Sequence, residues 1–152
     1  MNSGFTQQQF EILGAVGGTS AKGPQAGQAY DVLKQAHYAT RDWADDLKRT
    51  LFPEGKVKAR RAPINQGGNF TPYTWAKIYP YARAPEALAI TVGIDQDQSF
   101  IVKIDTVDTL GDLRKRYEAI RGPANDGSPI ARVLPAAQGL AMSRDELTAW
   151  SA

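Results

Sequence analysis

Two neighbouring segments, residues 88–94 and 100–107, constrain the fold of this chain most strongly. Apolar side chains recur in them at every second position: Leu88, Ile90, Val92, Ile94, Phe100, Val102 and Ile104. Because successive side chains of a strand point to opposite faces, each segment predicts a strand with one buried face. The residues between the two segments, 95–99, are polar and predict the turn of a hairpin.

Two further segments alternate in the same way. In residues 56–61 one face carries basic side chains and the other apolar ones: Lys58 and Arg60 against Val57 and Ala59. In residues 73–81 four aromatic rings and a lysine share one face: Tyr73, Trp75, Lys77, Tyr79 and Tyr81. A loop rich in glycine and proline, residues 62–72, separates these segments. Together with the hairpin they predict a mostly antiparallel sheet of about four strands.

Helices are predicted before and after these strands. Residues 6–9 have the form of a capping box and begin a short helix. The apolar spacing of residues 28–51 indicates a long helix, which a proline and a glycine end. A further helix is predicted over residues 109–121. A second capping box, residues 143–146, begins a last helix that still continues at the final residue.

This order of elements predicts an α+β fold, in which N-terminal and C-terminal helices flank the sheet. At 152 residues the chain is expected to form a single domain, residues 1–152. Because the last predicted helix has not ended, we interpret this domain as a module of a longer protein. A short terminal helix has the same appearance in a sequence.

The composition excludes several classes of protein. Without cysteine there is no disulfide, no thiolate zinc site and no cysteine nucleophile. No apolar run has the length of a membrane span, so no membrane partner is expected. The first ten residues lack the basic and apolar regions of a signal peptide. These features lead us to expect a cytoplasmic protein.

Residues 48–83 combine basic and aromatic side chains. Eight basic residues and one acidic residue give this segment a net charge of +7, whereas the whole chain carries only +2. The segment also contains six of the fourteen aromatic residues. Cations that neutralise phosphates, interleaved with rings that stack on bases, are typical of a nucleic-acid surface. An ordinary pair of strands, with its rings in the core and its lysines in solvent, has the same pattern.

The search for catalytic residues gives little. His37 is the only histidine, and it lies in the long predicted helix beside the apolar stripe, where it is more often a boundary residue than a catalyst. Residues 14–22 resemble a phosphate loop superficially, but a glycine does not precede the lysine and a helix precedes the loop. Glu54 and Lys56 match half of a metal nuclease core, with Glu54 in a turn.

Carboxylates offer the remaining enzymatic alternative. Asp95, Asp97, Asp105 and Asp108 lie close together in the sequence, so a divalent metal could bind among them. Acidic residues in a hairpin turn are more often plain turn residues. We therefore expect no metal, no cofactor and no enzymatic activity in this chain.

Several strings of residues resemble a known family. They are Phe70–Pro80, Leu88–Asp95 and Phe100–Val107, with further likeness at Pro63–Gln66, Ser128–Ile130 and Leu147–Trp150. These strings are similar to the N-terminal segment of McrB-like AAA proteins of modification-dependent (type IV) restriction systems. The resemblance implies an N-terminal recognition domain, residues 1–152, that binds DNA, including DNA with modified bases, in antiviral defence. It also implies a AAA motor elsewhere in the full-length chain, since the motor's phosphate-loop motif is missing here.

The leading hypothesis is a non-catalytic module that binds DNA, duplex rather than single-stranded. Its phosphate contacts are predicted to be Lys56, Lys58, Arg60 and Arg61, with Lys77 and Arg83 beside the rings. Its stacking or base-reading residues are predicted to be Tyr73, Trp75, Tyr79 and Tyr81, with Asn65, Gln66 and Asn69 nearby. The alternative is a domain that binds a partner protein or senses a phage component, with no nucleic-acid ligand.

Overall fold

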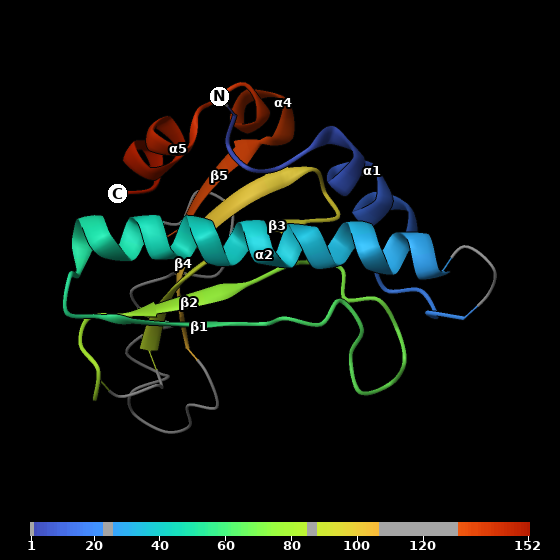
Figure 1. Cartoon of the computed structure of the whole chain (residues 1–152), viewed down its shortest axis with the longest axis horizontal. Helices are drawn as coiled ribbons and strands as arrows, with labels where there is room; N and C mark the ends of the chain where they lie inside the picture. Colours follow the sequence, from blue (N-terminus) through green and yellow to red (C-terminus); the bar gives the residue numbers. More distant parts are fainter. Residues whose placement is uncertain (1, 23–25, 85–87, 107–130) are drawn as a thin grey trace.

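The computed structural model describes residues 2–22, 26–84, 88–106 and 131–152. Its helices are α1 (Gln7–Val16), α2 (Ala26–Leu51), α4 (Ala136–Leu140) and α5 (Arg144–Ser151). Its strands are β1 (Lys56–Ala59), β2 (Ala76–Tyr79), β3 (Leu88–Asp95), β4 (Ser99–Thr106) and β5 (Ala131–Pro135). The strands form one antiparallel sheet in the order β1-β2-β3-β4-β5 (Figure 1). The predicted α+β class is confirmed.

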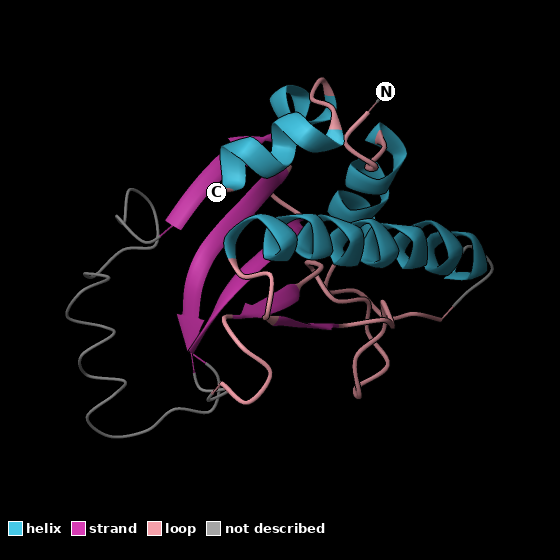
Figure 2. Ribbon diagram, turned by 60° about the vertical axis from the view of Figure 1, so that its left-hand side comes forward, coloured by secondary structure: helices cyan, strands magenta, loops and turns pink. Residues whose placement is uncertain are grey.

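The described helices pack on one face of this sheet (Figure 2). Helix α2 is the longest; it crosses β1, β2 and β3, and α5 packs against α2. Within the described residues, no helix is both long enough and apolar enough to span a membrane. We call the helix-covered side the inner face of the sheet and the other side the outer face.

The hairpin is as predicted. β3 and β4 pair along their whole length, with Ile90 opposite Ile104, Val92 opposite Val102 and Ile94 opposite Phe100. These side chains point to the inner face, where Val92, Ile94 and Phe100 are almost fully buried. Burial of such side chains contributes roughly 1.5–3 kcal/mol each, which fixes the register because a shift by one residue would expose them all.

An aromatic cluster packs the helices against the sheet. The ring of Phe100 lies 5.1 Å from Phe5, 5.0 Å from Phe10 and 5.8 Å from Trp43, measured between centroids. The indole of Trp43 also donates a hydrogen bond of 2.9 Å to the Ser151 hydroxyl in α5. The cluster thus joins α1, α2, β4 and α5, and both capping boxes predicted for α1 and α5 are present.

Three features differ from the sequence prediction. The sheet has five strands, because residues 131–135, for which no strand was predicted, form β5 and pair with β4. β1 and β2 are only four residues long. Residues 73–75, which precede β2, have only isolated backbone contacts, with β3 and with Arg60. α2 begins at Ala26, two residues before the predicted start. The helix predicted over residues 109–121 lies outside the described residues.

Candidate nucleic-acid interface

Three lysines of the outer face stand in one row across the sheet. Lys58 of β1 is directly opposite Lys77 of β2, Lys77 is opposite Thr91 of β3, and Thr91 is opposite Lys103 of β4. We call Lys58, Lys77 and Lys103 the lysine row. Adjacent strands are about 4.8 Å apart, so the row extends about 14 Å across the sheet.

The row concentrates positive charge on the outer face. Like charges directly opposite each other in a sheet are destabilising, and Lys58 and Lys77 form such a pair. The Lys77 ammonium donates a hydrogen bond of 3.1 Å to the Thr91 hydroxyl. All three lysines of the row have additional interactions within the protein, so an anionic ligand would compete with these contacts.

Trp75 lies beside the row. The Nζ atom of Lys77 is 5.3 Å from the centre of the Trp75 ring, a cation–π distance that orients the indole. The indole is half-buried. One residue before β2, Trp75 also accepts a backbone hydrogen bond of 3.2 Å from Arg60.

A groove with a volume of about 370 Å³ runs along the edge strand β1, between that strand and α2. Its lining comes from α2, β1 and the residues on either side of the strand pair: Arg41, Asp45, Val57, Lys58, Ala59, Arg61 and Trp75. We call it the Trp75 groove. Because Lys58 belongs to both, the groove and the lysine row form one continuous surface.

The charged side chains of the groove differ in how they are engaged. Arg41 lies 3.5 Å from the Asp42 carboxylate and over the Tyr38 ring. Neither the carboxylate of Asp45 nor the guanidinium of Arg61 forms a hydrogen bond or an ion pair with any described residue. The groove therefore presents an acceptor and cationic donors around an aromatic ring.

Two predicted ligand contacts have structural roles instead. The guanidinium of Arg60 donates to the backbone oxygens of Ala62 at 2.9 Å and Ile64 at 2.8 Å, so it holds the loop that follows β1. Tyr79 is only 1% exposed and packs with Ala84 and Ala89, and Lys56 lies over its ring at 5.2 Å. A ring buried in this way cannot stack on a base, so we remove Tyr79 and Arg60 from the proposed interface.

The amide side chains predicted to read bases lie in a separate loop. The Asn65 side chain accepts a hydrogen bond of 3.1 Å from the backbone of Asn69 and thus shapes its own turn. This turn docks on the segment after α1, where Ala21 donates to Gly68 and Phe70 donates to Thr19. Neither Asn65, Gln66 nor Asn69 lines the Trp75 groove.

The remaining predicted residues flank β2. Tyr73 is 48% exposed and Tyr81 is 52% exposed, each in the chain just outside the strand. Arg83 is exposed in the turn that follows Tyr81. These three side chains are accessible to a ligand, but they stand apart from the residues that line the Trp75 groove.

Three residues of this surface were not predicted from the sequence: Lys103, Arg41 and Asp45. Lys103 carried a usable signal, because it alternates with Val102 and Ile104 and so had to face away from the core. Arg41 and Asp45 are one helical turn apart at the border of the buried stripe of α2. Only the packing of α2 against β1 brings them to the groove.

His37 belongs to the core. It is 2% exposed, and its Nδ1 lies 3.1 Å from the Arg60 backbone oxygen, so Nδ1 carries the proton of the neutral ring. Desolvation by burial lowers the pKa of His37 from 6.5 to about 4. A neutral, buried imidazole with this contact supports the loop after β1.

Asp95 acts as a turn residue. Its carboxylate accepts hydrogen bonds from the backbone of Asp97 at 3.0 Å and Ser99 at 3.2 Å, which closes the hairpin. Burial and the neighbouring Asp97 raise the pKa of Asp95. Among the described residues, no group of three or more histidines or acids could hold a metal ion. The side chain of Asp105 and the whole of Asp108 lie outside the described residues.

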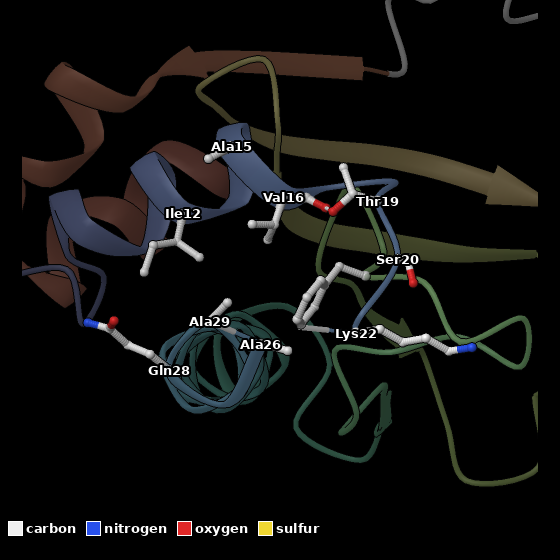
Figure 3. A pocket seen from close by; sticks show the side chains of 10 residues that line it. Ile12, Ala15, Val16, Thr19, Ser20, Lys22, Ala26, Gln28 and Ala29 are labelled. Carbon is white, nitrogen blue, oxygen red and sulfur yellow. Dashed lines mark hydrogen bonds between the residues drawn. The ribbon is translucent and has the colours of Figure 1, made fainter. Parts of the chain in front are cut away.

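A second groove, of about 540 Å³, lies between α1, the start of α2 and the segment after α1 (Figure 3). Its walls are mostly apolar, and Figure 3 shows Ile12, Val16 and Ala29 around it, with Lys22 at one side. None of the residues predicted as ligand contacts lines this groove.

No protein-family model matches this chain, and the comparisons with curated proteins and with solved structures find no match either.

Proposed function

We propose that this chain is a non-catalytic module that binds nucleic acid through the outer face of its sheet. The observation that carries the proposal is the lysine row, which sets three cations in register beside Trp75. The length of the row, about 14 Å, corresponds to about four nucleotides along one strand of B-DNA. Phosphates neutralised by Lys58, Lys77 and Lys103 supply affinity without sequence information.

Three cations in one row across the sheet support this proposal. Lys58 and Lys77 are directly opposite each other, so one phosphate between the two ammonium groups could bind both. Lys56 and Arg61 add charge at the β1 edge, and Tyr73 and Tyr81 add rings next to β2. The proposed interface therefore keeps Lys56, Lys58, Arg61, Tyr73, Trp75, Lys77, Tyr81 and Arg83 and gains Lys103.

The biological setting rests on the resemblance to McrB-like proteins. It supports DNA as the ligand, with modified bases as a further option, and a role as the targeting domain of a larger, motor-driven defence protein in the cytoplasm. In such a system a separate recognition domain would direct the motor and nuclease parts to their target.

The test compares two variants from which three lysines have been removed. The first replaces the lysine row, K58Q/K77Q/K103Q. The matched control, K22Q/K34Q/K48Q, removes the same charge from residues outside the outer face. Fluorescence anisotropy with labelled duplex and single-stranded DNA, at several salt concentrations, gives the affinity and its salt dependence for each protein.

The proposal predicts salt-sensitive binding by the unaltered chain and by the control. For the lysine-row variant, the slope of log K against log salt should become shallower by about 2.1 to 2.7, since each of the three phosphates no longer neutralised contributes roughly 0.7 to 0.9. If all three proteins bind equally, the lysine row is not the interface. If none binds DNA at low salt, the chain instead recognises a protein partner. A duplex with methylated cytosine, compared with its unmodified form, tests the restriction-system setting.

A further inference from the structure

A third pocket, of about 320 Å³, lies in the helical layer that covers the inner face of the sheet. It lies between the segment that precedes α1, the first turn of α1, the middle of α2 and the first residue of α5. We call it the Ser3 pocket. Its polar side chains are those of Ser3, Gln9, Gln35, Tyr38, Asp42 and Arg144. None of them belongs to the lysine row or lines the Trp75 groove, so this pocket is separate from the proposed nucleic-acid interface.

Two polar side chains of the pocket are buried without a full set of hydrogen bonds. Ser3 is 3% exposed, and its hydroxyl has no hydrogen-bond partner among the described residues. Gln9 is 5% exposed; its Oε1 accepts a hydrogen bond of 3.0 Å from the Thr6 backbone, whereas its Nε2 donates to no described residue. A buried polar group without a partner destabilises the fold. A ligand in the pocket would supply the missing partners.

The two ionised side chains of the pocket already have partners of opposite charge. The Asp42 carboxylate lies 3.5 Å from the Arg41 guanidinium. The Arg144 guanidinium donates from Nε and from Nη2 to the Asp46 carboxylate, each at 3.0 Å. The Nη1 of Arg144 donates to no described residue, and a carboxylate accepts more than one hydrogen bond. The pocket therefore offers hydrogen bonds to a ligand but no unpaired charge.

We propose that the Ser3 pocket binds a small neutral polyhydroxylated molecule, a monosaccharide or a cyclic polyol. A hydroxyl group both donates and accepts, so one ligand hydroxyl can donate to Asp42 and accept from Gln9 or Arg144. The hydroxyls of Ser3 and Tyr38 can take either role. An apolar ligand would leave these groups unpaired, and an ion would find its counter-charge already paired. The volume of about 320 Å³ is at the lower end of the range for small-ligand sites, roughly 300–1,000 Å³, which suits one ring.

The unpartnered hydroxyl separates this site from a merely structural one. If the ligand supplies the partner of Ser3, the variant S3A loses a contact with the ligand but also loses an unpaired buried group in the free chain. Binding should therefore weaken while the stability of the free chain stays the same or increases. The proposal does not depend on the nucleic-acid interface, so its outcome and that of the proposed function can be distinguished.

The test titrates the isotope-labelled chain with glucose, ribose or myo-inositol and follows the amide chemical shifts. Gluconate and glucosamine, which carry a negative and a positive charge on the glucose skeleton, are the charged comparators. The variants S3A and D42A each remove one proposed contact. The control S20A removes an exposed serine hydroxyl that lines the second groove instead. Urea midpoints without ligand give the stability of each protein.

At least one neutral probe should bind saturably, with shift changes concentrated at Ser3, Gln9 and Asp42. Binding should be at least fivefold weaker for S3A and D42A and unchanged for S20A, and glucose should bind at least fivefold more tightly than its charged derivatives. Shift changes that grow linearly with concentration, or that are the same in S3A and the unaltered chain, would refute the site. A clear loss of stability in S3A would also refute it, because the hydroxyl would then already have a partner.

Discussion

The same strands carry different side chains on the two faces of the sheet. On the inner face Val92, Ile94 and Phe100 are buried under the helices, and the fold depends on them. On the outer face the alternate positions of β2 and β4 hold Lys77 and Lys103, which have their own contacts within the protein. Under the proposed function, alternation along a strand separates residues that stabilise the fold from residues that bind the ligand, so substitutions on the two faces should have separable effects.

The largest effect on the inner face is expected for Phe100→Ala. Phe100 is fully buried and contacts three other rings, so its removal should lower the free energy of unfolding by about 3–5 kcal/mol. Phe100→Leu, which keeps most of the apolar volume, should cost clearly less. Urea denaturation measures both. Equal stability of the Ala variant and the unaltered chain would show that the aromatic cluster does not hold the helices on the sheet.

The burial of His37 predicts that the free energy of unfolding depends on pH. The pKa is 6.5 in the unfolded chain and about 4 in the folded one, so between these values the unfolded chain binds more protons. Stability conferred by the neutral ring is complete above pH 6.5 and is lost as the pH falls toward 4, by about 3 kcal/mol in all. Urea midpoints from pH 7 to pH 4.5 should therefore fall more steeply for the unaltered chain than for His37→Asn. Parallel curves for the two proteins would contradict the assignment.

A smaller effect is expected where α5 docks. Ser151→Ala removes the acceptor of the buried Trp43 indole N–H, so the free energy of unfolding should fall by about 1–3 kcal/mol. Double substitution with Trp43→Phe, which removes the donor as well, should cost less than the sum of the two single changes. Strict additivity would show that the two side chains do not depend on each other.

The smallest effect on stability belongs to the outer face. Lys77→Gln removes one of two opposed lysines together with the contacts of Lys77 to Thr91 and Trp75, so these effects offset one another and the free energy of unfolding should change by less than about 1 kcal/mol. The same variant should bind DNA more weakly and with a shallower salt dependence. A large loss of stability with unchanged DNA affinity would reverse the roles assigned to the two faces.

Much of the fold could be predicted from local patterns. The hairpin, the two capping boxes and the long helix each depend on a periodicity or a short motif, and all four are present. β5 was not recognised because its five residues, with Arg132 among them, are too few to show a period. Arg132 donates to the carbonyl oxygens of Trp150 and Ala152, a tertiary contact that no local pattern reveals.

The candidate site could be predicted only in part. Lys58, Trp75 and Lys77 follow from alternation, and they do lie together. Alternation also grouped Tyr79 with them, but it could not show that Ala84 and Ala89 bury that ring. Arg60 looked like a phosphate contact because a sequence shows its charge and not the carbonyl oxygens that it binds. Arg41 and Asp45 required the packing of α2 on β1.

The most direct test of the two-face account is to map bound DNA by NMR. Amide chemical shifts of the isotope-labelled chain are recorded during titration with a short single-stranded oligonucleotide. The account predicts that perturbations concentrate at Lys58, Trp75, Lys77 and Lys103, while Val92, Phe100 and the α1 residues remain unchanged. Perturbations confined to the helical side, or none at low salt with DNA in excess, would contradict the claim that the outer face binds nucleic acid.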